Sequence, residues 1–166
     1  QDLAYMREEE QLAQAVYLAN AARWPTVQVF ANVASSEATH TSAVKALLDR
    51  YTLADPLAGL DVSSFKTPLF QTLYADLVTA SAASLVAAVK VGVQIEELDI
   101  SDLASRRAAT DNVDIQLVYD NLERGSRNHL RAYMSVLVQQ GGSYTPQYIS
   151  QAEFDGIVNS PMEKGR

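Results

Sequence analysis

Two histidines and a few phased acids are the side chains in this sequence most suited to chemistry. Glu37 precedes His40 by three residues, which places a carboxylate and an imidazole one turn apart on the same face of a helix. His129 holds a similar position in a later periodic segment. Carboxylate oxygen and imidazole nitrogen are both metal ligands. The pairing therefore indicates a metal site, and because the chain contains no cysteine, that site must use oxygen and imidazole nitrogen.

Four long segments carry apolar residues at alternating spacings of three and four, which is typical of amphipathic helices. We predict bundle helices over residues 2–23, 26–51, 82–107 and 112–140, followed by a tail over 141–166. Trp24-Pro25 separates the first two helices, and Gly141-Gly142 ends the fourth. The sequence predicts one all-α domain over residues 1–166.

The second and third bundle helices are joined by a long link, residues 52–80. Within it, Thr67-Pro68 is a helix-start pattern ahead of a short helix over residues 69–79. A link of this length would let the third helix run parallel to the second. The predicted architecture is a ferritin-like four-helix bundle with a long crossover and short extra helices. In the tail, Ser150-x-x-Glu153 predicts one more short helix, and the last six residues are expected to be mobile.

A polar break interrupts the apolar stripe near the middle of each bundle helix. Burying such groups without partners costs several kcal/mol, so a layer of them requires neutralisation. Two divalent cations would provide it, with bridging carboxylates and one imidazole on each metal. The predicted ligands are Glu10 on the first helix, Glu37 and His40 on the second, Glu96 on the third and His129 on the fourth.

Some neighbouring acids leave alternatives open. Glu9 replaces Glu10 if the first helix is rotated, although most charge runs such as Glu8-Glu9-Glu10 are solvated. Glu96 is in phase with its stripe, whereas Glu97 is expected to be exposed. Asp99 is either a ligand or the carboxylate that accepts a hydrogen bond from a histidine.

Inward tyrosines and one glycine also have two interpretations each. Tyr17, Tyr119 and Tyr133 lie on apolar stripes, where core packing is the default and hydrogen bonding to a ligand or electron transfer is the alternative. Gly92, one turn before Glu96, gives close access either to a neighbouring helix or to a small oxidant.

Composition excludes several classes of protein. A net charge of -7 and a pI near 4.7 argue against nucleic-acid binding, which requires clustered Lys and Arg. No apolar run approaches the ~20 residues of a membrane span, so a soluble protein without a membrane partner is expected. The sequence begins at Gln1 without an initiator Met. Removal of a signal peptide, with export to the periplasm or the exterior, is one explanation among several; without export, a cytoplasmic location is expected.

Several motifs resemble a known superfamily. Glu10-x-x-Ala13 with Tyr17 resembles the first helix of rubrerythrins, members of the ferritin-like superfamily, whose helices present Glu, Glu-x-x-His, Glu and Glu-x-x-His around two iron or manganese ions. The segments most similar to one bacterial and archaeal branch, the DUF2202 proteins, are Met6-Arg7-Glu8-Glu9-Glu10, Ile95-Glu96-Glu97-x-Asp99-Ile100-x-Asp102-Leu103 and Gly125-Ser126-Arg127-Asn128-His129-Leu130. The resemblance covers residues 2–140.

One position departs from that pattern. Ser126 stands where the second Glu-x-x-His of a rubrerythrin has its acid, and a hydroxyl is a poor substitute for a bridging carboxylate. Either Asp99 or Glu123 replaces the acid, with Asp99 favoured because Glu123 is out of phase, or the second metal is bound weakly or not at all.

Carboxylate and imidazole ligation with an open position suits ferrous iron, which dioxygen or peroxide would oxidise. We therefore expect a di-iron centre with oxidoreductase chemistry, either peroxide reduction or ferroxidase activity, with manganese or zinc as alternative metals; the resemblance to the DUF2202 branch does not itself supply an activity. The implied partners are dioxygen or peroxide and an external electron donor, because the chain lacks a cysteine-ligated rubredoxin module. A homodimer would be common for this superfamily. Two alternatives remain: a non-catalytic protein for metal binding or storage with a single or degenerate site, and a bundle whose polar layer only fixes helix register.

Overall fold

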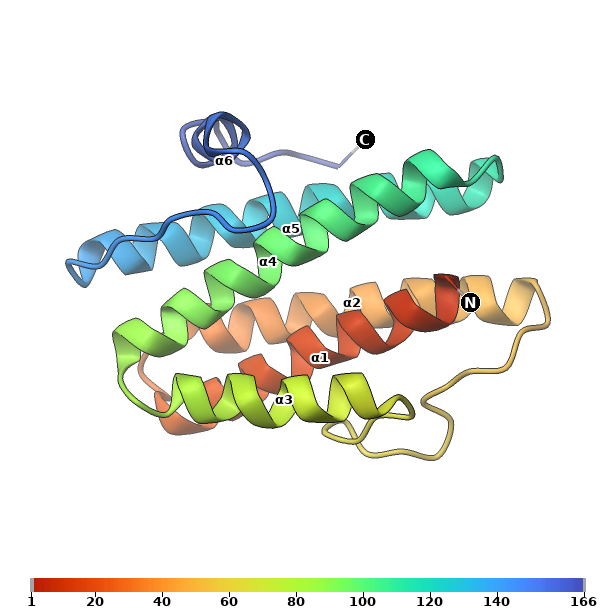
Figure 1. Ribbon diagram of the computed structural model, residues 1–166, viewed down its shortest axis with the longest axis horizontal. Helices are drawn as coiled ribbons and strands as arrows, with labels where there is room; N and C mark the ends of the chain where they lie inside the picture. The colour runs from red at the N-terminus through yellow and green to blue at the C-terminus, as the bar shows by residue number, and fades with distance from the viewer. Residues whose placement is uncertain (1, 166) are drawn as a thin grey trace. The chain divides into compact units, whose positions relative to one another are not determined.

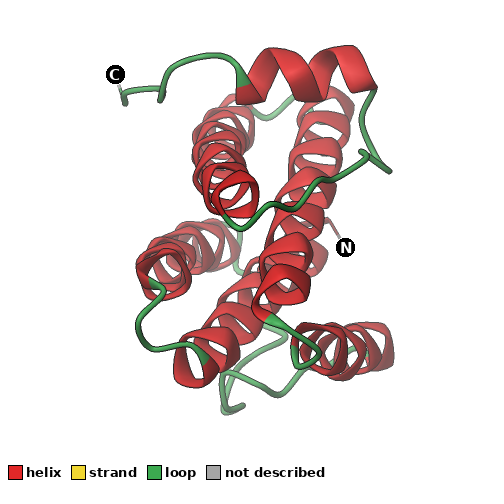
Figure 2. Cartoon of the chain, turned by 90° about the vertical axis from the view of Figure 1, so that its left-hand side faces the viewer, coloured by secondary structure: helices red, strands yellow, loops and turns green. Residues whose placement is uncertain are grey.

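The computed structural model describes residues 2–165, a range that contains six α-helices and no strand (Figures 1 and 2). The helices are α1 (Asp2–Arg23), α2 (Gln28–Arg50), α3 (Pro68–Ser81), α4 (Leu85–Ala109), α5 (Val113–Gln139) and α6 (Gln151–Val158). The all-α prediction is confirmed. The four predicted bundle helices correspond to α1, α2, α4 and α5, with ends that differ by at most three residues.

Two compact units make up the chain, residues 1–83 and residues 84–166. In the first unit α1 and α2 form a hairpin, and α3 packs on α1 (Figure 1). In the second unit α4 and α5 form a hairpin, and α6 packs on α5. Both hairpins are antiparallel because their connections are only a few residues long. The organisation as one ferritin-like domain stays a prediction.

The α1–α2 hairpin has an apolar seam beneath its polar residues. Met6, Val16, Tyr17, Phe30 and Val44 are fully buried there. The turn between the helices follows Trp24-Pro25, as predicted, and the Trp24 ring lies 6.1 Å from the Phe30 ring. This packing fixes the register that sets α1 residues against α2 residues.

Polar side chains of α1 hold the long link in place. Arg7 forms an ion pair with Asp55 (Nε to Oδ1, 3.2 Å), and Gln11 donates to the carbonyl oxygens of Asp61 and Ser64 at 3.4 and 3.3 Å. Glu8 accepts hydrogen bonds from the backbone N–H of Thr67 (2.8 Å) and from the Thr67 hydroxyl. The link is therefore a surface segment, as predicted, but one that is anchored along its length.

The α4–α5 hairpin packs closely at a glycine. A Cβ added to Gly92 would lie 2.7 Å from Cε1 of Tyr133, which is fully buried. The close approach at Gly92 is thus to an aromatic ring of the neighbouring helix. The two glycines after α5 end the helix as predicted: Gly141 has a φ of 72°, and the Gly142 N–H donates to the Leu137 carbonyl at 2.9 Å.

Two helix starts follow the predicted chemistry. Thr67 is the N-cap residue before Pro68, and Ser150 accepts a hydrogen bond from the Glu153 N–H at 3.2 Å. The third bundle helix begins three residues later than predicted, because α3 continues to Ser81 and Ser84 then caps α4. Between residues 2 and 165, no helix combines the length and the apolar character needed to cross a membrane.

Candidate metal centre

In the first unit, an imidazole lies against two carboxylates. His40 Nδ1 is 3.0 Å from Glu37 Oε2 on the same helix and 3.2 Å from Glu10 Oε2 on α1. Glu37 and His40 are brought together by their i, i+3 spacing, and the hairpin register adds Glu10. The glutamates are 1% exposed and His40 is 8% exposed. One nitrogen and two oxygen donors of this kind match the ligand chemistry of a divalent transition metal.

The pKa values of Glu10 and His40 depend on each other and on Glu37. Burial is the largest influence on Glu10 and raises the pKa of its carboxyl from 4.5 to about 7, although His40 works in the opposite direction. Burial also disfavours the charged form of His40, but Glu37 and Glu10 outweigh it and raise the pKa of the imidazole far above its ordinary value of 6.5. The two glutamates therefore favour the protonated form of His40, and a metal ion would have to displace that proton.

The charge run at the start of α1 is not solvated. Glu8, Glu9 and Glu10 are 2%, 3% and 1% exposed, although most such runs face water. The reason is that α1 is covered on several sides: α2 packs on it, α3 packs on it, and the link reaches Glu8 through Thr67. Tyr17, two turns after Glu10, is completely buried, which accords with core packing.

The second unit repeats the pairing with different elements. His129 Nδ1 on α5 is 3.3 Å from Glu96 Oε2 on α4, and the two residues are 8% and 1% exposed. Here the acid and the imidazole come from two helices, so the α4–α5 register decides the contact. Each unit therefore buries one imidazole against at least one glutamate.

Ser126, which stands where the rubrerythrin pattern has an acid, contacts the carboxylate of Asp99. Its hydroxyl donates a hydrogen bond to Asp99 Oδ2 on α4 and also lies 3.1 Å from the Leu122 carbonyl oxygen. Both side chains are buried, with Ser126 at 0% and Asp99 at 5% exposure. Asp99 thus brings a carboxylate to the side chain of Ser126, one turn before His129.

Glu123 is engaged elsewhere. Arg107 approaches its Oε2 through Nη2 at 2.9 Å, and Arg127 contacts its Oε1 through Nη1 at 2.7 Å. Both carboxylate oxygens are therefore held by guanidinium groups. Of the two acids considered as substitutes at the Ser126 position, the geometry favours Asp99.

Glu97 contradicts the expectation that it would be exposed. It is completely buried. Its Oε1 accepts hydrogen bonds from the backbone N–H groups of residues 147, 148 and 149 at 2.7, 2.6 and 3.0 Å, and Oε2 accepts one from the Tyr144 hydroxyl at 2.6 Å. Burial, together with Glu97, raises the pKa of Tyr144. The connector after α5 therefore covers this side of α4. No local pattern in the sequence predicts that contact.

Fold and site together define the class of this protein. It is an all-α chain that buries an acid and imidazole set in each of its two helical hairpins. The chain belongs to the DUF2202 family: the family model, described as "Uncharacterized protein domain (DUF2202)", matches residues 1–161. This confirms the DUF2202 resemblance, whereas membership of the ferritin-like superfamily stays a prediction.

One relative has both a sequence and a solved structure. The chain is 48% identical over 163 residues to the uncharacterized protein MJ0754 of Methanocaldococcus jannaschii, a match that covers 98% of this chain and 88% of that protein. The crystal structure of hypothetical protein MJ0754 from Methanococcus jannaschii superimposes with a TM-score of 0.95 and covers 98% of this chain and 92% of that one. The all-helical architecture is therefore shared with a crystal structure.

Proposed function

We propose that this chain is a metal-binding protein of the di-metal carboxylate type, with Glu10, Glu37, His40, Glu96 and His129 as ligands and Asp99 as an auxiliary acid. The proposal rests on one observation above all. In each unit a buried imidazole places its Nδ1 close to glutamate oxygens, at 3.0 and 3.2 Å in the first and 3.3 Å in the second.

The donor set fits a divalent cation better than a simple ion pair. The hairpin of α1 and α2 gathers two carboxylates around one imidazole, and burial disfavours the charge on Glu10. Several negative groups in an apolar interior are costly unless cations compensate them. A divalent metal would replace the proton on His40 and neutralise both glutamates, so binding should release protons and weaken as the pH falls.

Iron is the metal that we favour, with manganese or zinc as alternatives. The chemistry that iron supplies when bound is electron transfer to dioxygen or peroxide, which corresponds to ferroxidase or peroxide-reducing activity. The chain's own contribution is to exclude water through its apolar seam and to hold the carboxylates in place. Because it contains no cysteine, peroxide turnover would require an external electron donor.

Metal content tests the proposal directly. After anaerobic loading with Fe(II) and desalting, we expect about two irons per wild-type chain, by analogy with other di-iron carboxylate bundles. His40→Ala and His129→Ala should each lower the content, whereas Asp76→Asn, an exposed acid on α3, should leave it unchanged. Fewer than one iron per chain, unaffected by His40→Ala, would contradict the proposal.

A second candidate function is supported by Ser126. Its hydroxyl already binds Asp99, so the second unit has a weaker acid set than a Glu-x-x-His would give. The chain would then hold a single metal, such as zinc, without catalysis. One tightly bound redox-inert metal per chain, together with no Fe(II)-dependent consumption of oxygen or peroxide, would favour this function over the first.

A further inference from the structure

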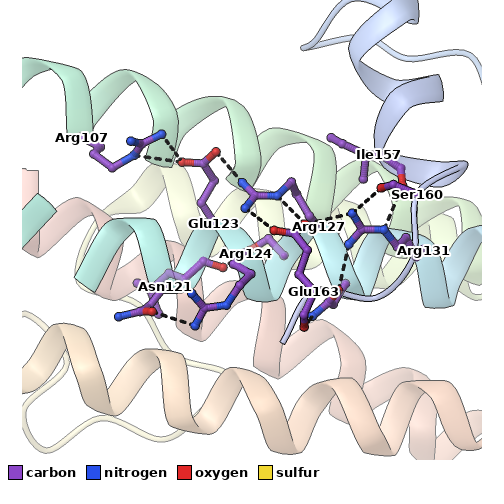
Figure 3. A network of polar contacts seen from close by, with 12 residues as sticks. Arg107, Asn121, Glu123, Arg124, Arg127, Arg131, Ile157, Ser160 and Glu163 are labelled. Atoms are coloured by element: carbon purple, nitrogen blue, oxygen red, sulfur yellow. Dashed lines mark hydrogen bonds and ion pairs between the residues drawn. The ribbon is translucent and has the colours of Figure 1, made fainter. Parts of the chain in front are cut away.

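The C-terminal segment after α6 is bound to α5 through a glutamate. Arg127 forms a two-pronged contact with the Glu163 carboxylate, with Nε 2.8 Å from Oε1 and Nη2 2.7 Å from Oε2 (Figure 3). Arg131 adds a third charged contact, from Nη2 to Oε1, at 2.9 Å. Paired contacts of this kind between guanidinium and carboxylate are both strong and selective in geometry.

The backbone of Glu163 is also bound by α5. The Asn128 side chain donates to the Glu163 carbonyl oxygen at 2.9 Å and accepts from the Glu163 N–H at 2.8 Å. Glu163 is therefore recognised by its backbone and its side chain together. This combination is how recognition sites hold an extended peptide with a specified residue.

Arg131 links that contact to the end of α6. Its Nε donates to the Ile157 carbonyl at 2.9 Å, its Nη2 contacts the Ser160 hydroxyl at 2.8 Å, and its side chain is only 7% exposed (Figure 3). Among residues 2–165, the acid that pairs with this buried guanidinium is Glu163. Removing that carboxylate would leave a buried cation without its counter-charge, which is costly.

Arg127 is held in position independently of the tail. Its Nη1 contacts Glu123 at 2.7 Å, and Arg107 binds the other oxygen of Glu123. The order Arg107, Glu123, Arg127 thus forms a chain of charges that ends in a fork facing Glu163 (Figure 3). The supports of Arg127 therefore lie on α4 and α5 and do not include the C-terminal segment.

We propose that Arg127, Asn128 and Arg131 form a recognition site for an extended peptide bearing a glutamate, and that residues 160–163 of this chain occupy it as an intramolecular ligand. The partner that fits is an acidic peptide segment presented by another polypeptide. The site is separate from the five proposed metal ligands, since none of its contacts involves Glu10, Glu37, His40, Glu96 or His129; Glu123, the less favoured auxiliary acid, supports Arg127 instead.

The space beside the C-terminal segment is consistent with replacement of that segment by another peptide. A hollow of about 660 Å³ adjoins Glu163 and is lined in part by Leu117, Arg124 and Lys164. Met162 and Lys164, which precede and follow Glu163, are exposed. A competing peptide could therefore enter next to the bound segment without unfolding α5.

Binding of a labelled peptide in trans tests this proposal. The probe is a fluorescein-labelled peptide with the sequence of residues 159–164, and the receptor is the full-length chain carrying Glu163→Lys, which repels its own tail from the two arginines. We expect this variant to bind the peptide at least tenfold more tightly than the wild type, in which the tethered segment competes at an effective concentration on the order of millimolar.

Two controls make the result specific. Arg127→Gln, added to the Glu163→Lys receptor, should weaken peptide binding at least tenfold, and a peptide with glutamine in place of its glutamate should bind equally poorly. Circular dichroism should show unchanged helicity in both receptors. If the folded Glu163→Lys receptor binds no peptide, or binds the glutamate and glutamine peptides alike, the segment is simply a packed tail and the proposal fails.

Discussion

Glu97 shows what a single buried carboxylate does for this fold. Three consecutive backbone N–H groups and the Tyr144 hydroxyl converge on it, so a connector without regular structure is fastened to α4. Hydrogen bonds to a charged acceptor contribute about 1.5–3 kcal/mol each, and leaving buried donors unsatisfied is costly. Glu97 is therefore a structural anchor beside Glu96, a predicted metal ligand.

Glu97→Gln should lower the free energy of unfolding by about 1–3 kcal/mol, because the amide offers one acceptor oxygen where the carboxylate offers two. Urea unfolding followed by circular dichroism measures this change. Asp76→Asn, on an exposed part of α3, is the matched control and should change stability by no more than about 0.5 kcal/mol. Equal midpoints for the two variants would show that the anchor contributes little.

At the scale of elements, helix packing depends on where side chains are absent. Gly92 lets the ring of Tyr133 lie directly against the backbone of α4. This sets the spacing of the hairpin that carries Glu96 and His129. In α6, by contrast, a Cβ added to Gly156 would meet no atom within 4 Å.

Two Gly→Ala substitutions should therefore have opposite effects. Gly92→Ala gains about 1 kcal/mol in helix propensity but forces a methyl group to 2.7 Å from the Tyr133 ring, so we expect a net loss of about 1–3 kcal/mol. Gly156→Ala gains propensity without a clash and should stabilise the chain by up to about 1 kcal/mol. Denaturant midpoints compare the two. A Gly92→Ala variant as stable as the wild type would mean that the hairpin adjusts freely.

For the molecule as a whole, an ion-paired carboxylate anchors an irregular segment in each unit. Burial alone would raise the pKa of Asp55, but Arg7 and the Leu57 N–H outweigh it and lower that pKa. The Arg127 hydrogen bond is the largest influence on Glu163 and, with Arg131, lowers the pKa of that carboxyl from 4.5 to about 2. Both groups stabilise the folded chain in their charged form.

Acid should therefore loosen these anchors. A lowered pKa in the folded state contributes stability that is complete above the unfolded value and is lost as the pH falls through the folded value. For Glu163 the window runs from about pH 4.5 down to about pH 2. Melting temperatures recorded across it should fall less steeply for Glu163→Gln than for the wild type. Parallel curves would indicate that the contacts with Arg127 and Arg131 add no net stability.

The sequence by itself determined the helices and the composition of the candidate site. Apolar spacing located α1, α2, α4 and α5, and the Gly141-Gly142 pair located the end of α5, because helix periodicity and capping depend on near neighbours. The same phase selected Glu10, Glu37 and His40, whose contact then follows from one short turn. Metal binding itself remains a prediction for these residues.

Only the tertiary structure decided which acids are ligand candidates and which are anchors. Glu96 and Glu97 are adjacent, yet one faces His129 and the other fastens a connector about fifty residues away. Glu8 is fastened to Thr67, and Glu163 binds α5, although the last six residues were expected to be mobile. The physical reason is that burial of a polar side chain depends on which distant irregular segment covers it, and such contacts leave no periodic pattern in the sequence.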